Sequence, residues 1–238
     1  MRIGPSAEGH LVKYATMPRV GAFFDLDRTV VACNTGRLFL KDLRRRGELS
    51  AGRAIRALGW LLKYHFSLID GDRIAGKVTE GMRGRSEQEF AAACKRLVEA
   101  DVLPRVLPGA IRKIAEHRAA GHFTAILSTA PSYIAQPVAE LLGMDAAIST
   151  RLEVEGGLFT GRVVRPTCFG RGKVHWAEDL GSRRSLDLDQ SWFYTDSYTD
   201  LPMLERVGNR VIVNPDPRLR RAAKQRGWTV ESWSEAAA

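Results

Sequence analysis

VGAFFDLDRT, residues 20–29, is the stretch of sequence that decides the fold. Its apolar half, residues 20–24, has the pattern of a buried strand in a parallel sheet, and it leads directly into acidic residues. In open α/β sheets, ligands bind just outside the carboxyl ends of the strands. The sequence therefore predicts that chemistry takes place immediately after this first strand.

The rest of the chain divides into a helical segment and an alternating segment. Residues 35–103 show apolar residues at helical spacing and no strand pattern. From Pro108 an amphipathic helix, ended by Gly121, leads into a second apolar run at residues 122–127. Further helices are predicted at 132–142, 172–180, 200–208 and 217–227, and further strands at 192–195, 210–214 and 228–233.

This alternation predicts the fold class α/β, with a doubly wound parallel sheet of the Rossmann-like kind and active residues at the strand ends. We assign residues 1–34 and 104–238 to this core and residues 35–103 to an inserted helical domain. Residues 150–166 have the pattern of a β-hairpin around Gly156 and Gly157, which need not join the sheet.

The composition is that of a soluble globular protein. Of the 238 residues, 45% are hydrophobic and 26% charged, and no apolar run is long enough to span a membrane. Residues 1–18 have a basic start but lack the apolar run of a secretion signal, so we expect a loose leader and a cytoplasmic protein. Cys33, Cys94 and Cys168 form no CxxC pair, which favours reduced thiols over a structural zinc site.

The formal net charge of +9 suits anionic partners, but it does not choose among nucleic acid, acidic membrane and phosphorylated metabolites. A cationic helix at residues 54–66 that carries Trp60, Tyr64 and Phe66 supports an alternative of another class, a basic protein that binds RNA or acidic membrane. Core packing explains the same aromatic residues. Without an RNA-binding motif we expect no nucleic-acid partner, and no stable membrane insertion.

Two carboxylates, Asp25 and Asp27, follow the first strand, with Thr29 two positions further along. Residues i and i+2 of an extended chain point the same way, so we expect both carboxylates to face one point. A hard cation such as Mg²⁺ binds through one or two carboxylates together with substrate phosphate, which fits this pair. The plainer interpretation is an aspartate that caps a turn.

Further candidate residues follow three other predicted elements. Asp196 and Asp200 lie just beyond a buried strand, although Asp200 could also be a helix N-cap. Ser128, with Thr129 beside it, ends an apolar run before a helix, where hydroxyl and backbone N–H groups can bind phosphate. Lys173 begins a helix behind two glycines, where its ammonium could meet a phosphate or lie in solvent.

The order of these pieces, DLDRT, a serine after a strand, a glycine-flanked lysine and DSYTD, resembles the four motifs of the haloacid dehalogenase superfamily of phosphohydrolases. The resemblance covers residues 20–233. It is closest to the branch that includes phosphoserine phosphatases, which carry a helical cap after the first motif, where residues 35–103 lie. It implies a Mg²⁺-dependent phosphatase that hydrolyses a small phosphate monoester through an aspartyl phosphate. A phosphotransferase using the same intermediate remains an alternative.

The resemblance also implies a role for each residue. It makes Asp25 the nucleophile and Asp27 the general acid and base, with Asp25, Asp27 and Asp196 as the metal ligands. Asp200 would orient Lys173 or a metal-bound water. The substrate phosphate would be bound by Ser128, Thr129, Lys173 and Thr29, and Thr29 would also fix the turn or Asp27 through a hydrogen bond.

Two positions depart from the family pattern. Arg28 stands where most such motifs have a small residue. Asn34, seven positions after Asp27, stands where phosphoserine phosphatases have a glutamate that can pair with the substrate ammonium. Asn34 suits a hydroxyl or an amide instead, so we expect a substrate other than phosphoserine, unless a carboxylate such as Glu80 supplies the charge. No feature of the sequence indicates an oligomeric state.

Overall fold

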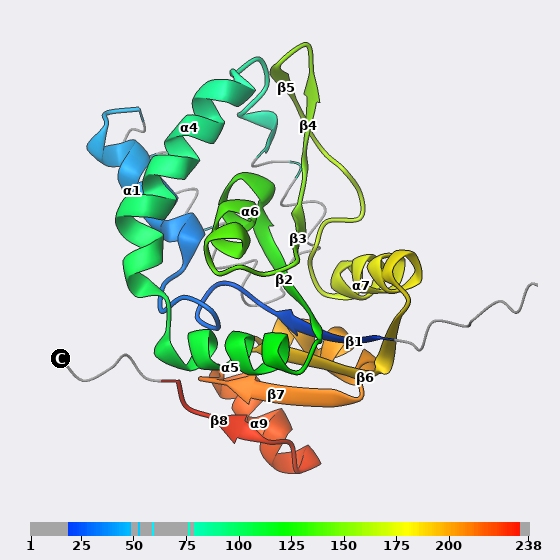
Figure 1. The fold of residues 1–238 in the computed structure, drawn as a ribbon. Helices are drawn as coiled ribbons and strands as arrows, with labels where there is room; N and C mark the ends of the chain where they lie inside the picture. The colour runs from blue at the N-terminus through cyan, green and yellow to red at the C-terminus, as the bar shows by residue number, and fades with distance from the viewer. Residues whose placement is uncertain (1–18, 49–51, 53–58, 60–75, 77–78, 234–238) are drawn as a thin grey trace, which may run out of the picture.

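A six-stranded parallel sheet forms the centre of the protein (Figure 1). The computed structural model describes residues 19–48, 52, 59, 76 and 79–233. Strand β1, Arg19–Phe24, lies in the middle of the sheet, between β2, Phe123–Pro131, and β6, Leu186–Thr195. The remaining strands complete the order β3-β2-β1-β6-β7-β8, with β3 at Ala146–Thr150, β7 at Asn209–Val213 and β8 at Val230–Glu231.

Helices cover both faces of this sheet, which confirms the doubly wound architecture. Ala22 and Phe24 of β1 pack with α5, Pro108–Ala119, and α6, Ser132–Leu141. Phe23, on the opposite side of the same strand, belongs to a second core formed with the other helices. These are α7 at Arg171–Arg184, α8 at Leu201–Arg206 and α9 at Pro217–Arg226, and the short 3₁₀ turn η3 at Tyr198–Asp200 precedes α8.

The described parts of residues 35–103, which we call the insert, are mostly helical. They comprise α1 at Thr35–Arg45, α4 at Glu87–Leu97, the π-helical turn η1 at Val98–Val102 and the 3₁₀ turn η2 at Leu103–Arg105. Helix α4 packs against α1 and against α6 of the core. The cationic helix with Trp60, Tyr64 and Phe66 lies outside the described residues, and the domain boundaries stay a prediction.

The predicted hairpin is formed by β4, Leu152–Glu155, and β5, Leu158–Val163, and it stands apart from the main sheet. Its backbone bonds to the insert: the N–H of Gly84 donates to Phe159 O at 2.8 Å, and the N–H of Phe159 donates to Arg85 O at 3.0 Å. The N–H of Glu87 donates to Gly157 O at 3.0 Å. The hairpin therefore ties the insert to the core, which the sequence pattern does not indicate.

Several element bounds differ from the prediction for local reasons. Strand β6 begins at Leu186, earlier than the predicted start at residue 192. Its first half was not predicted because it is polar, with only Leu186 and Leu188 buried, and so does not have the sequence pattern of a strand. Beside it the pairing with β1 is irregular, and the N–H of Gly21 donates to Ser191 Oγ at 2.8 Å. Helix α7 extends to Arg184, and β8 keeps only two residues.

The structure also bears on membrane-spanning helices and on the state of the cysteines. Among the residues with described structure, no helix is long and apolar enough to cross a membrane. Cys33, Cys94 and Cys168 are all unpaired, as the spacing of the cysteines predicts.

We expect Gly208→Ala to destabilise the protein, because a methyl group on this residue would lie 1.6 Å from the carbonyl oxygen of Asp189. Overpacking of this kind costs about 1–3 kcal/mol or more. Gly181→Ala in α7 is the matched control, since its methyl would come no nearer than 3.4 Å to any atom outside its own helix backbone. Thermal unfolding should show a lower Tm for the first variant and an equal or higher Tm for the second. Equal Tm values would contradict the close approach of the two backbones.

Candidate active site

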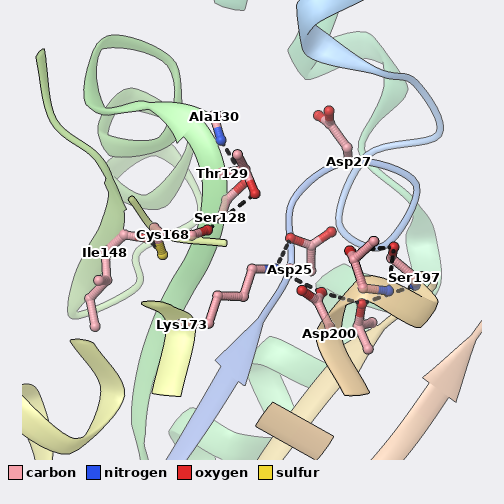
Figure 2. A network of polar contacts seen from close by, with 12 residues as sticks. Asp25, Asp27, Ser128, Thr129, Ala130, Ile148, Cys168, Lys173, Ser197 and Asp200 are labelled. Carbon is pink, nitrogen blue, oxygen red and sulfur yellow. Dashed lines mark hydrogen bonds and ion pairs between the residues drawn. The ribbon is translucent and has the colours of Figure 1, made fainter. Parts of the chain in front are cut away.

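The predicted functional residues meet at the carboxyl edge of the sheet (Figure 2). Asp25 directly follows β1, and Asp196 directly follows β6. Ser128 lies near the end of β2, and Lys173 lies in the first turn of α7. Because β1 has β2 and β6 as its two neighbours, the sheet topology brings Asp25, Ser128 and Asp196 to the same edge.

Lys173 connects two carboxylates of the site, Asp25 and Asp200. Its Nζ donates to Asp25 Oδ1 at 2.6 Å and to Asp200 Oδ2 at 2.7 Å, and its side chain is only 2% exposed. Burial alone would lower the pKa of Lys173, but the carboxylates of Asp200 and Asp25 outweigh it and hold this pKa above its ordinary value. Lys173 is therefore a buried ammonium and does not lie in solvent. Asp200 makes no side-chain hydrogen bond as the N-cap of α8, which was the alternative role for this residue.

The glycines around Lys173 are needed for this placement. Gly170, the N-cap of α7, has φ +51°, in the left-handed region that glycine adopts without strain. A methyl group on Gly172 would lie 1.9 Å from the carbonyl oxygen of Thr167, so only glycine lets the helix start this close to the preceding loop. The glycines bring the first turn of α7, and with it Lys173, up to Asp25.

The Asp27 carboxylate does not face Asp25, and that part of the prediction is wrong. It points to the start of α1, where Oδ1 accepts from the Thr35 N–H at 3.0 Å and Oδ2 accepts from Asn34 Nδ2 at 2.9 Å (Figure 2). Strand β1 ends at Phe24, and the chain then turns, with Arg28 in the left-handed region at φ +60°. The alternation of an extended strand thus no longer applies. Burial raises the pKa of Asp27, although the Thr35 N–H opposes this.

Asp196 is buried without a partner. Its carboxylate makes no hydrogen bond or ion pair with any residue that the structure describes, while its backbone carbonyl accepts from the Asp216 N–H at 2.8 Å. Burial, and then the carboxylates of Asp25 and Asp200, raise the pKa of Asp196 well above its usual range. Burial likewise raises the pKa of Asp25 to about 7, against the opposing effect of Lys173.

This surplus of buried negative charge fits a divalent cation. Asp25 and Asp196 offer only oxygen atoms, the ligands of a hard ion such as Mg²⁺. Within the described ranges no group of three or more histidine, cysteine or acidic side chains is arranged to hold a metal. A cation here would have to complete its coordination with backbone, water or substrate oxygens, as Mg²⁺ commonly does. The place of Asp27 in the metal set stays a prediction.

The hydroxyl residues differ in what they can offer a phosphate. Ser128 Oγ accepts from the Ala130 N–H at 3.2 Å, which leaves its own proton free to donate. Thr129 Oγ1 already donates to Cys168 O at 3.1 Å. Thr29 Oγ1 is buried and has no hydrogen-bond partner among the described residues, but the Thr29 N–H donates to Leu26 O at 3.3 Å, so Thr29 holds the turn through its backbone and not through its hydroxyl. Backbone bonds from Val30 and Val31 to the same Leu26 O also close this turn.

Two supporting residues were not predicted. Thr195 Oγ1 donates to Asp200 Oδ2 at 2.7 Å, and so helps to fix the carboxylate that holds Lys173. Asp216 Oδ2 accepts from the Tyr198 N–H at 2.8 Å, while Oδ1 caps the start of α9. An aspartate directly before a proline at the first position of a helix is a recognisable N-cap signal, but its link to the loop at 196–200 depends on the tertiary fold.

Comparison with known proteins identifies the family. The model of the haloacid dehalogenase-like hydrolases matches residues 22–205, so the chain belongs to that family. It is 33% identical to a protein of Mycobacterium tuberculosis named a probable phosphatase, over 92% of this chain and 77% of that protein. It is 32% identical to a phosphoserine phosphatase of the same species, over 89% of this chain and 70% of that protein.

A solved structure has the same overall fold. It is a protein of unknown function from Bordetella pertussis, 28% identical, with a TM-score of 0.81 over 90% of this chain and 98% of that one. The parallel core and the hydrolase family predicted from the sequence are therefore confirmed.

We expect Asp196→Asn to stabilise the metal-free protein above neutral pH. Asp196 and Asp25 bind protons more tightly when folded than when unfolded, so stability is lost as pH rises from about 4, the ordinary aspartate pKa, through the raised folded values. The amide removes one of these buried charges. Mg²⁺ should raise the Tm of the parent more at pH 8 than at pH 5, and this rise should be largely lost in the variant.

Asp189→Asn is the control for this comparison, because the Asp189 side chain is 84% exposed. It should behave as the parent does at both pH values. A full Mg²⁺-dependent rise in the Tm of Asp196→Asn would show that Asp196 does not bind the cation.

Proposed function

We propose that the protein is a Mg²⁺-dependent phosphatase that hydrolyses a small phosphate monoester through an aspartyl phosphate on Asp25. The observation that carries this proposal is the buried ammonium of Lys173 between Asp25 and Asp200, at the carboxyl edge of the sheet. A carboxylate held beside a fixed cation is suited to attack an anionic phosphorus centre. Membership of the family and the relative named a probable phosphatase support it.

The reaction has two balanced steps. In the first, an Asp25 oxygen forms a bond to phosphorus as the bond to the leaving oxygen breaks, and Asp27 gives that oxygen a proton. In the second, Asp27 takes a proton from water as the water oxygen bonds to phosphorus, which frees inorganic phosphate and restores the Asp25 carboxylate. General acid and base catalysis of this kind contributes about 10²–10⁴-fold in rate.

The other residues bind and orient. Lys173, and Ser128 through its free hydroxyl proton, would hold the phosphate oxygens. Asp200 and Thr195 keep the Lys173 ammonium in place. Phosphatases of this family generally use Mg²⁺. When bound by Asp25 and Asp196, the ion would neutralise charge on the phosphate and on the attacking carboxylate.

Transfer of the phosphate to an alcohol instead of water remains the second candidate, because the residues of the first step are the same. We also propose that residues 35–103 act as a cap that selects the substrate, since the side chains at the sheet edge would contact only the phosphate group and the metal ion. The chemistry therefore assigns the reaction class to the core and the choice of substrate to the insert.

We expect Asp25→Asn to reduce phosphatase turnover by at least about 10³-fold, because the amide keeps the shape but is not a nucleophile. The measurement is p-nitrophenyl phosphate hydrolysis with Mg²⁺, together with thermal unfolding to show that the fold is retained. Beryllium fluoride should inhibit the parent only when Mg²⁺ is present. Activity of Asp25→Asn within about tenfold of the parent would exclude Asp25 as the nucleophile.

We also expect phosphoserine to be a poor substrate, although one relative is named a phosphoserine phosphatase. Asn34 carries no charge, and Glu80 is exposed with its backbone next to Gly161 of the hairpin. An unpaired ammonium forgoes a charged hydrogen bond worth about 1.5–3 kcal/mol, or roughly tenfold or more in kcat/KM. The measurement compares kcat/KM for phosphoserine with that for sugar, polyol, amino-alcohol and lipid phosphates. A clear preference for phosphoserine would refute this expectation.

A further inference from the structure

We propose that Asn34 is a positioning residue for Asp27. This inference rests on the proposed function, in which Asp27 is the general acid and base. It differs from the expectation that Asn34 meets a hydroxyl or amide of the substrate. It also means that the first turn of α1, at the start of the insert, helps to orient the proposed general acid and base.

Both ends of the Asn34 amide are already used. Nδ2 donates to Asp27 Oδ2 at 2.9 Å, and Oδ1 accepts from the Arg37 N–H at 2.9 Å as the N-cap of α1. Rotating the amide by half a turn would place oxygen against the carboxylate and a donor against the N–H, so the two contacts fix its orientation. Each end of the amide thus makes one hydrogen bond that holds Asp27 or α1, and only the second Nδ2 hydrogen and the second lone pair of Oδ1 remain.

Asp27 in turn depends on the start of α1. Its Oδ2 accepts from the Asn34 side chain, and its Oδ1 accepts from the Thr35 N–H at 3.0 Å. The Thr35 side chain also hydrogen-bonds to this carboxylate and lowers its pKa, so the described donors come from the junction of core and insert. The positive end of a helix adds to the attraction. The Asp27 carboxylate is thus held by two adjacent residues, Asn34 and Thr35.

A neutral donor is the chemistry that position 34 requires. At 2.9 Å from Asp27 Oδ2, a carboxylate would repel Asp27, whereas the amide attracts it and at the same time caps α1. A general acid acts only within hydrogen-bond reach of the atom it protonates. Loss of the Asn34 donor should therefore reduce proton transfer to the leaving oxygen, while the binding of the phosphate by Lys173 and Ser128 is unaffected.

Asn34→Asp tests this directly. Aspartate is as good an N-cap as asparagine, so α1 is kept, but the donor to Asp27 becomes an acceptor. An alkyl phosphate, whose leaving group needs a proton in the first step, should lose about 10²-fold in the single-turnover rate of that step, with little change in KM. The loss on p-nitrophenyl phosphate, whose leaving group is a weak base, should be at least about tenfold smaller.

Asn34→Ala and Ser86→Ala separate positioning from capping. Ser86 caps α4 through the Glu89 N–H at 3.3 Å and has no contact with Asp27. Both alanine variants should lower the Tm, but only Asn34→Ala should show the loss that depends on the leaving group. In an Asp27→Asn background, Asn34→Ala should cause no further loss of kcat, because the two residues act as one unit.

The outcomes distinguish this inference from the proposed function. If Asn34→Asp matches the parent on both substrates, or if the Asn34 variants raise KM instead of lowering kcat, Asn34 does not act through Asp27. An additive loss in the Asp27→Asn background would have the same meaning. If the parent hydrolyses neither substrate, or if Asp25→Asn is fully active, the proposed function fails and the inference falls with it.

Discussion

The burial of one ammonium group between two carboxylates is the constraint on which the site depends. A charge that is 2% exposed is tolerated only when it is paired at hydrogen-bond distance, and Lys173 meets both Asp25 and Asp200 in this way. The pairing requires α7 to begin against the preceding loop, which Gly172 permits. It also requires Asp200 to be fixed, which Thr195 achieves. The residues at positions 172 and 195 are thus explained by the two ion pairs of Lys173.

The remaining buried charge works against the stability of the fold. Asp196 has no partner among the described residues, and Asp25 shares Lys173 with Asp200, so the centre carries more negative than positive charge. Such an arrangement costs free energy in the absence of a cation and is typical of sites that bind one. The same carboxylates that weaken the metal-free protein are the oxygens that a hard divalent ion prefers.

The sequence was sufficient for the parts of the structure that local pattern determines. The strand before Asp25, the order of the motifs and the hairpin at Gly156 and Gly157 were all predictable, because each depends on spacing within a few residues. The direction of the Asp27 side chain was not, because the strand ends one residue before Asp25 and the following turn passes through a positive φ at Arg28. A side-chain contact across a turn, such as Thr195 with Asp200, and a contact between distant segments, such as the hairpin with the insert, leave no periodic signal.

The bonds between the hairpin and residues 84–87 also restrict how the insert can move. Helix α4 begins at these bonds and runs toward η1 and η2, which return the chain to α5 (Figure 1). At that end the Leu107 N–H is bonded to Val30 O at 2.9 Å. Helix α4 is therefore tied to the hairpin at its start and, through η1 and η2, to the core beyond its end. The first turn of α1 holds the Asp27 carboxylate, so a displacement of α1 would also displace the donors of the proposed general acid.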